Sequence, residues 1–131
     1  MFSMWGGNPY STTLRGSLHK NMFRTNTKLS NISHKFAGCN LITGALDGDI
    51  FITNTNLTDC SVTFEGTKFT SIGAKLLSTN PKIYNITRMF KGNNKVTGNA
   101  PKLWETLATQ TSECFAGCTF DDQDDIPMTY K

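Results

Sequence analysis

Charged residues are scarce in this 131-residue chain. Asp, Glu, Lys and Arg make up 18% of it and the AVILMFWYC group 37%, and Asn, Thr, Ser and Gly fill much of the difference. So low a charge excludes a charge-rich disordered tail, and the composition also excludes a helical bundle built from Ala, Glu, Lys and Leu. The chain therefore suits one turn-rich, strand-rich domain.

Long apolar runs are also missing. No segment reaches the roughly 18 residues of a membrane-spanning helix, and Met1 to Tyr10 lacks the basic start and apolar run of a signal peptide. Thirteen basic residues against ten acidic ones give a net charge of +3, and the basic residues are scattered. Because no stripe of basic residues would neutralise a run of phosphates, we expect no nucleic-acid partner. Because no apolar run is long enough, we also expect no membrane insertion.

Histidine is rare, and recognisable catalytic motifs are absent from the sequence. His19 and His34 are the only two histidines, and neither belongs to a nucleophile elbow or an HExxH pair. The acidic residues cluster where loops are expected. We therefore expect no enzyme activity, no catalytic residue and no cofactor.

What the chain does contain is an internal repeat. Four segments end in Phe-x-Gly, and their phenylalanines, Phe36, Phe64, Phe90 and Phe115, lie 28, 26 and 25 residues apart. This spacing is typical of repeat arrays. The units run approximately over residues 1–22, 23–50, 51–76, 77–103 and 104–131.

A second large apolar residue recurs about half a repeat away from the Phe-x-Gly phenylalanines. These residues are Phe23, Phe51, Leu77, Trp104 and Tyr130. A unit of this length cannot bury its own apolar face, so neighbouring units must stack, and we expect both sets of residues in the core. The outermost units would then expose apolar end faces, which predicts that residues 1–131 belong within a larger assembly.

Local sequence predicts the shape of each unit. Residues 29–32, 57–60 and 83–86 are too brief for helices and are expected as short strands. Residues 33–36 and 87–90 fit a single helical or 3₁₀ turn that points the phenylalanine inward. Gly38, Gly66, Gly92 and Gly117 supply the positive φ that ends the turn. The predicted fold class is a β-rich solenoid of short strands with turns or single helical turns, about 26 residues per repeat.

These motifs together resemble a known family. Met-Phe-x-Gly-Cys/Asn, Leu/Val-Thr-Gly, Pro-x-x-Trp or Leu-Phe, and Asn-x-x-Leu-x-Asn-Ile-Thr recur over about residues 14–131. They resemble the BspA-like leucine-rich repeats of bacterial and protist surface proteins, and similar arrays in bacteriophage tail and virion proteins. The resemblance implies a leucine-rich-repeat-like solenoid.

The resemblance also implies a function in recognition or architecture. The leading interpretation is a bacteriophage virion or tail-fibre component that binds a host receptor or neighbouring virion proteins, at the virion or extracellular surface. The alternatives are an adhesin domain of a bacterial or protist surface protein and a carbohydrate-binding accessory module. All three expect a protein or a glycan as the partner.

The four cysteines are expected as buried thiols. Cys39 and Cys118 occupy the same repeat position several coils apart, too far for the Cα separation of about 6 Å that a disulfide needs. Cys60 aligns with buried apolar positions. The Cys114-x-x-x-Cys118 spacing, with no second pair or nearby histidine, is weak evidence for a metal site.

Three sequons raise the question of glycans, at Asn31, Asn56 and Asn85. Asn31 and Asn85 share one repeat position, which Asp59 also occupies. A carboxylate or amide that recurs once per turn favours a hydrogen bond to the adjacent backbone over a glycan.

The run Asp121–Asp125 gathers four carboxylates in five residues. Oxygen-rich loops bind calcium, but this run does not match the EF-hand spacing. A solvated acidic loop is the favoured interpretation, with a calcium site as the alternative.

Tyr10 and Tyr84 are the candidate binding residues. A tyrosine ring exposed on one face of an array can stack on a sugar or anchor a protein partner. Neither residue shares a repeat position with the large apolar residues expected in the core.

Overall fold

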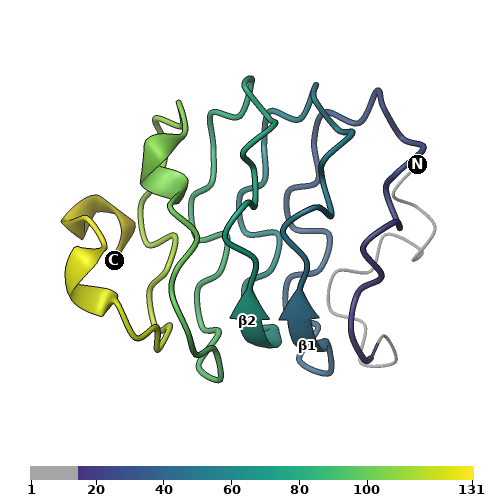
Figure 1. Cartoon of the computed structure of the whole chain (residues 1–131). Helices are drawn as coiled ribbons and strands as arrows, with labels where there is room; N and C mark the ends of the chain where they lie inside the picture. The colour runs from purple at the N-terminus through teal and green to yellow at the C-terminus, as the bar shows by residue number, and fades with distance from the viewer. Residues whose placement is uncertain (1–14) are drawn as a thin grey trace.

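The computed structural model describes residues 15–131. Successive coils of the chain lie side by side, in sequence order from the N-terminal to the C-terminal side (Figure 1). Parallel bridges join Asn31 to Asp59, Asp59 to Asn85, and Asn85 to Gln110. These are residues of one repeat position, so neighbouring coils run in the same direction and meet in register.

Two regular strands occur in the described part of the chain, β1 (Thr43–Leu46) and β2 (Lys68–Ile72). They pair in parallel, with a bulge between Gly44 and Ala45, and lie next to each other at one edge of the coils (Figure 1). The strands expected at 29–32, 57–60 and 83–86 are not formed: these segments hold only single bridges.

Asx turns limit those segments to single bridges. The backbone N–H of Ser33 donates to Oδ1 of Asn31 at 2.8 Å, and the same bond joins Ser61 N to Asp59 Oδ1 at 2.8 Å. A side-chain oxygen that binds the N–H two residues on bends the backbone into a turn. The chain therefore leaves the extended conformation directly after each bridge.

The helical turn expected after each bridge is also wrong. One residue of this turn in each coil instead has a left-handed backbone, with φ between 55° and 65°: His34, Val62, Arg88 and Glu113. A left-handed residue interrupts a right-handed turn. Peptide N–H groups then alternate, so that Lys35 donates within its own coil to Ile32 O at 3.2 Å, while His34 donates across to Ser61 O at 3.1 Å.

The Phe-x-Gly phenylalanines form one column through the stack. Phe36, Phe64, Phe90 and Phe115 are buried, and their ring centroids follow one another at 5.5, 5.6 and 6.0 Å with interplanar angles of 10° to 15°. These separations lie in the range of favourable offset stacking. Each ring covers its neighbour, so the core is shared between coils.

The second column departs from the sequence prediction. Phe23 and Phe51 stack at 5.5 Å and Leu77 is buried. Leu103 is fully buried at the next step, whereas Trp104 is only half-buried. The prediction of Trp104 as a core residue is therefore wrong. The 3₁₀ helix η2 (Leu103–Glu105) turns Leu103 inward.

Tyr130 belongs to the first column, not to the second as predicted. It lies in η4 (Met128–Tyr130), which follows η3 (Gln123–Asp125). Its ring stacks on Phe115 at 6.1 Å, and its hydroxyl donates to Leu103 O at 3.2 Å. On this side, the apolar end face expected to be exposed is covered, and Phe115 is 2% exposed.

One glycine is fixed by a close approach of two coils. A Cβ added at Gly73 would lie 2.3 Å from the backbone nitrogen of Gly48. Backbone atoms cannot yield as a flexible side chain can, so the coils can meet here only with glycine at position 73.

Candidate binding surface

Tyr84 is exposed, while its backbone ties two coils together. Tyr84 as a whole residue is 44% exposed. Its N–H donates to Thr58 O at 2.9 Å, and its carbonyl accepts from Thr109 N and Gln110 N at 3.0 Å each. The ring is therefore carried on a firmly bonded backbone and is open to a partner. Tyr10, the other candidate, lies outside the described residues.

The recurring Asn/Asp position is used within the fold, as the sequence favoured. Asn31, Asp59 and Asn85 each accept a hydrogen bond from the N–H two residues on, and Asn85 does so at 3.1 Å from Thr87. The third sequon residue, Asn56, donates its amide to Thr27 O at 3.1 Å. These side chains support the coils.

The sequence analysis missed the buried asparagines, of which Asn54 and Asn80 form a pair in neighbouring coils. Asn54 Nδ2 donates to Phe23 O at 3.0 Å and to Asn26 O at 2.7 Å. Asn80 Nδ2 repeats this one coil later, to Phe51 O at 3.1 Å and Asn54 O at 2.8 Å. The available signal was the spacing Phe-x-Thr-Asn at residues 23–26 and 51–54, and Leu-x-Thr-Asn at 77–80.

All four cysteines are buried thiols. Burial raises the pKa of the Cys60 and Cys114 thiols well above their ordinary value, and raises the pKa of Cys118 to about 12. The Cys118 sulfhydryl also donates to Phe90 O at 3.2 Å. A thiol that stays protonated is a poor nucleophile and a poor metal ligand, so these residues act here as core side chains.

The acidic run Asp121–Asp125 is built into the last coil. Asp122 Oδ1 accepts the N–H of Ala100 at 2.9 Å, and Gln123 Oε1 accepts the N–H of Phe120 at 3.2 Å. Within residues 15–131, no three His, Cys, Asp or Glu side chains gather as a metal site would require. The calcium alternative gains no support from this arrangement.

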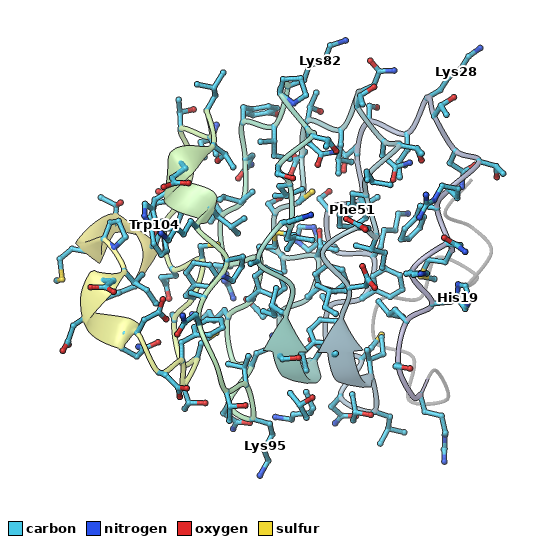
Figure 2. The ribbon with its side chains drawn as sticks, in the orientation of Figure 1. His19, Lys28, Phe51, Lys82, Lys95 and Trp104 are labelled. Atoms are coloured by element: carbon cyan, nitrogen blue, oxygen red, sulfur yellow. The ribbon has the colours of Figure 1, made fainter. Side chains whose placement is uncertain are left out.

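Lysines lie on opposite edges of the coils. Lys28 and Lys82 project from one edge of the coils and Lys95 from the opposite edge (Figure 2). Within residues 15–131, two ion pairs link neighbouring coils, Arg88 Nε to Glu65 Oε1 at 2.7 Å and Lys91 Nζ to Glu113 Oε1 at 2.6 Å. The hydrogen bond from Lys91 lowers the pKa of the Glu113 carboxyl.

Among the hollows on the surface of residues 15–131 are a side pocket and an end groove. The side pocket, of about 360 Å³, has an apolar floor that includes Leu76 and Leu77, and a rim that includes Lys102 and Glu105. The end groove, of about 460 Å³, is lined by hydroxyl and amide side chains: Thr87, Thr109, Gln110, Thr111, Ser112 and Thr129. The side pocket therefore offers apolar surface beside charged side chains, and the end groove offers uncharged polar groups.

No helix within residues 15–131 is long and apolar enough to cross a bilayer. Comparison with family models, with curated proteins and with solved structures finds no match to this chain.

Proposed function

We propose that this chain is a non-catalytic repeat domain that works in recognition or architecture. Its coils are assigned to a leucine-rich-repeat-like solenoid of the BspA-like type. The proposed setting is a bacteriophage virion or tail, where the domain binds a host receptor or neighbouring virion proteins.

The observation that supports this proposal is the use the repeat makes of its recurring polar side chains. Asn54 and Asn80 bond to the preceding coil, and Asn31, Asp59 and Asn85 bond to their own turns. An array in which each coil stabilises the next offers one long rigid surface. Rigid surfaces favour binding because little conformational entropy is lost on association.

Tyr84 is the residue proposed to contact the partner. A tyrosine supplies a large contact area with few rotatable bonds, and Tyr84 carries its ring on a backbone bonded to both neighbouring coils. An aromatic face of this kind suits either a sugar ring or an apolar protein side chain. A glycan is therefore the second partner class, as in a carbohydrate-binding accessory module.

The test is a binding screen against glycan and protein arrays, run in parallel with a panel of glycosidase, esterase and peptidase substrates. We expect a saturable ligand and no turnover, with Tyr84→Ala weakening binding at least about tenfold, or 1.4 kcal/mol. Tyr84→Phe is the matched control, since it keeps the ring. The proposal would be overturned if the purified protein turned over any substrate and if substituting residues of this protein abolished that activity.

A further inference from the structure

The edge of the last coil repeats a hydrogen-bonding pattern that is only partly satisfied within residues 15–131. At each earlier step, four alternate N–H groups of one coil donate to four alternate carbonyls of the next. The N–H groups of Cys60, Val62, Phe64 and Gly66 bond to Asn85, Thr87, Met89 and Lys91 at 2.8 to 2.9 Å. The N–H groups of Ile86, Arg88, Phe90 and Gly92 bond in the same way to Gln110, Ser112, Cys114 and Ala116, at 2.8 to 3.0 Å.

In the last coil the equivalent residues are Thr111, Glu113, Phe115 and Gly117, each 25 residues further on. Phe115 N donates to Tyr130 O at 2.8 Å. Thr111 N and Glu113 N donate no hydrogen bond within residues 15–131. Gly117 N also donates none there. Thr111 N and Glu113 N, two donors spaced two residues apart, are therefore left at a half-buried edge beside Thr129, whose carbonyl accepts from Thr111 Oγ1 at 3.4 Å. They stand in the register that a further segment of chain would fill.

The end groove lies at the same place. It runs beside Thr111 and Ser112 and reaches Thr129 in η4. Its hydroxyl and amide lining suits a backbone and small polar side chains better than an apolar side chain. The end groove therefore lies beside the two backbone donors, Thr111 N and Glu113 N.

Charge indicates which kind of segment fits. Residues 104–131 carry six acidic residues and one lysine, a net charge of −5, whereas residues 1–103 carry twelve basic and four acidic residues, a net charge of +8. The acidic ones are Glu105, Glu113, Asp121, Asp122, Asp124 and Asp125. A basic partner segment is attracted to this end of the stack and an acidic one is repelled.

We infer that the end groove is a docking site for a basic, extended segment of a partner polypeptide, two of whose backbone carbonyl oxygens accept hydrogen bonds from Thr111 N and Glu113 N. The inference rests on the proposed function and names its partner chemistry. Backbone hydrogen bonds supply the register, as in other cases of strand addition, and the acidic residues select the charge.

The probe is a capped peptide copying residues 83–92, Ile-Tyr-Asn-Ile-Thr-Arg-Met-Phe-Lys-Gly, which is a rung of this protein with two basic residues. Its fluorescein-labelled form is titrated with the intact 131-residue protein and followed by anisotropy. We expect saturable binding that weakens as NaCl rises from 50 to 500 mM. A peptide with Glu in place of both basic residues should bind at least about tenfold more weakly.

The matched variants are Thr129→Trp, which fills the groove, and Thr27→Trp, which places the same ring on an exposed residue of an early coil. We expect the first to weaken binding at least about tenfold and the second to leave it unchanged. Hydrogen exchange of the unsubstituted protein is the second measurement, since it needs no variant. Added peptide should slow exchange over residues 109–114 and not over residues 57–66.

Three results would overturn the site: no binding at millimolar peptide, equal binding by Thr129→Trp with the native circular dichroism, or protection confined to other coils. Self-association of the protein that the peptide does not displace would count against a partner segment and assign the edge to a second copy. None of these results touches the array screen with Tyr84→Ala. Failure of the docking site and failure of the proposed function are therefore separate outcomes.

Discussion

Asn80 and Asn54 are joined across two coils by a hydrogen bond of 2.8 Å, from Asn80 Nδ2 to the backbone carbonyl oxygen of Asn54. The same amide group donates to Phe51 O at 3.1 Å, and Asn80 is 3% exposed. One side chain thus satisfies two buried carbonyls of the preceding coil.

Asn80→Ala is therefore expected to lower the free energy of unfolding by about 2–4 kcal/mol. Each lost hydrogen bond contributes about 1 kcal/mol, and the desolvation of its abandoned carbonyl adds to that loss. The measurement is urea denaturation at neutral pH. Asn56→Ala is the control, because Asn56 also donates to a backbone carbonyl one coil away but at an exposed site, and it should cost less than about 1 kcal/mol. Equal losses in both variants would contradict the role assigned to the buried amide.

Phe64 occupies the middle of the first aromatic column. It stacks on Phe36 and Phe90 at 5.5 and 5.6 Å, and Phe69 meets its edge at 5.2 Å. Phe64→Ala should lower the free energy of unfolding by about 3–5 kcal/mol, through lost burial and the cavity left behind. Tyr84→Ala, at an exposed ring, should change it by no more than about 0.5 kcal/mol. Thermal and urea denaturation check both, and a tolerant Phe64→Ala would show that the column is not continuous.

The aromatic columns were predictable because burial follows the repeat. Large apolar residues recur once or twice per repeat, and a repeat of this length can bury them only against the neighbouring coils. The buried ones are Phe23, Phe36, Phe51, Phe64, Leu77, Phe90 and Phe115. Trp104 was wrongly predicted as a core residue because the sequence analysis aligned it, as a large apolar residue, with Phe23, Phe51 and Leu77 of the second column. Its neighbour Leu103 is the fully buried residue, and the hydroxyl of Thr106, three residues on, donates to Leu103 O at 2.6 Å.

The backbone was less predictable than the core. Val62 and Arg88 have φ values of 60° and 55°, a conformation that side chains other than glycine and asparagine rarely adopt. Valine and arginine are not residue types from which a positive φ would be predicted. The hydrogen bonds from these N–H groups to the next coil hold the conformation, and they exist only after the coils have stacked.

The free edge at Thr111 and Glu113 also could not be predicted from the sequence. Its donors are backbone groups, which carry no signal in residue identity. They are found only by comparing one coil boundary with the next.

High pH should destabilise the fold through Cys118. Burial raises the pKa of its thiol to about 12, from an ordinary value of 9.0. Above about pH 9 the unfolded chain loses this proton while the folded chain keeps it, so stability is fully present below pH 9 and falls as the pH rises toward 12.

The measurement is the urea midpoint of the protein and of Cys118→Ser at pH 8 and pH 10.5. Between these values the unsubstituted protein should lose about 1–2 kcal/mol more than the variant does. Cys60 and Cys114 titrate in both proteins, so their contributions cancel in the comparison. Identical pH dependence in the two proteins would show that the Cys118 thiol is accessible to solvent.

Tyr130 should hold the last coil in place. Its ring covers Phe115, its carbonyl accepts Phe115 N at 2.8 Å, and its hydroxyl reaches Leu103 O at 3.2 Å. Tyr130→Phe removes only the hydroxyl and should cost about 1 kcal/mol, whereas Tyr130→Ala uncovers Phe115 and should cost about 3 kcal/mol. Met128→Ala, at a residue 81% exposed in the same η4, should stay within about 0.5 kcal/mol.

Uncovering Phe115 has a second consequence that sedimentation velocity detects. A bare aromatic face at the end of a stack promotes association, so Tyr130→Ala should form concentration-dependent oligomers at concentrations where Tyr130→Phe behaves as the unsubstituted protein does. Because the phenylalanine variant keeps the ring and loses the hydrogen bond, the pair separates coverage of the column from the bond to Leu103. If both variants associate alike, the hydroxyl and not the ring protects this end of the stack.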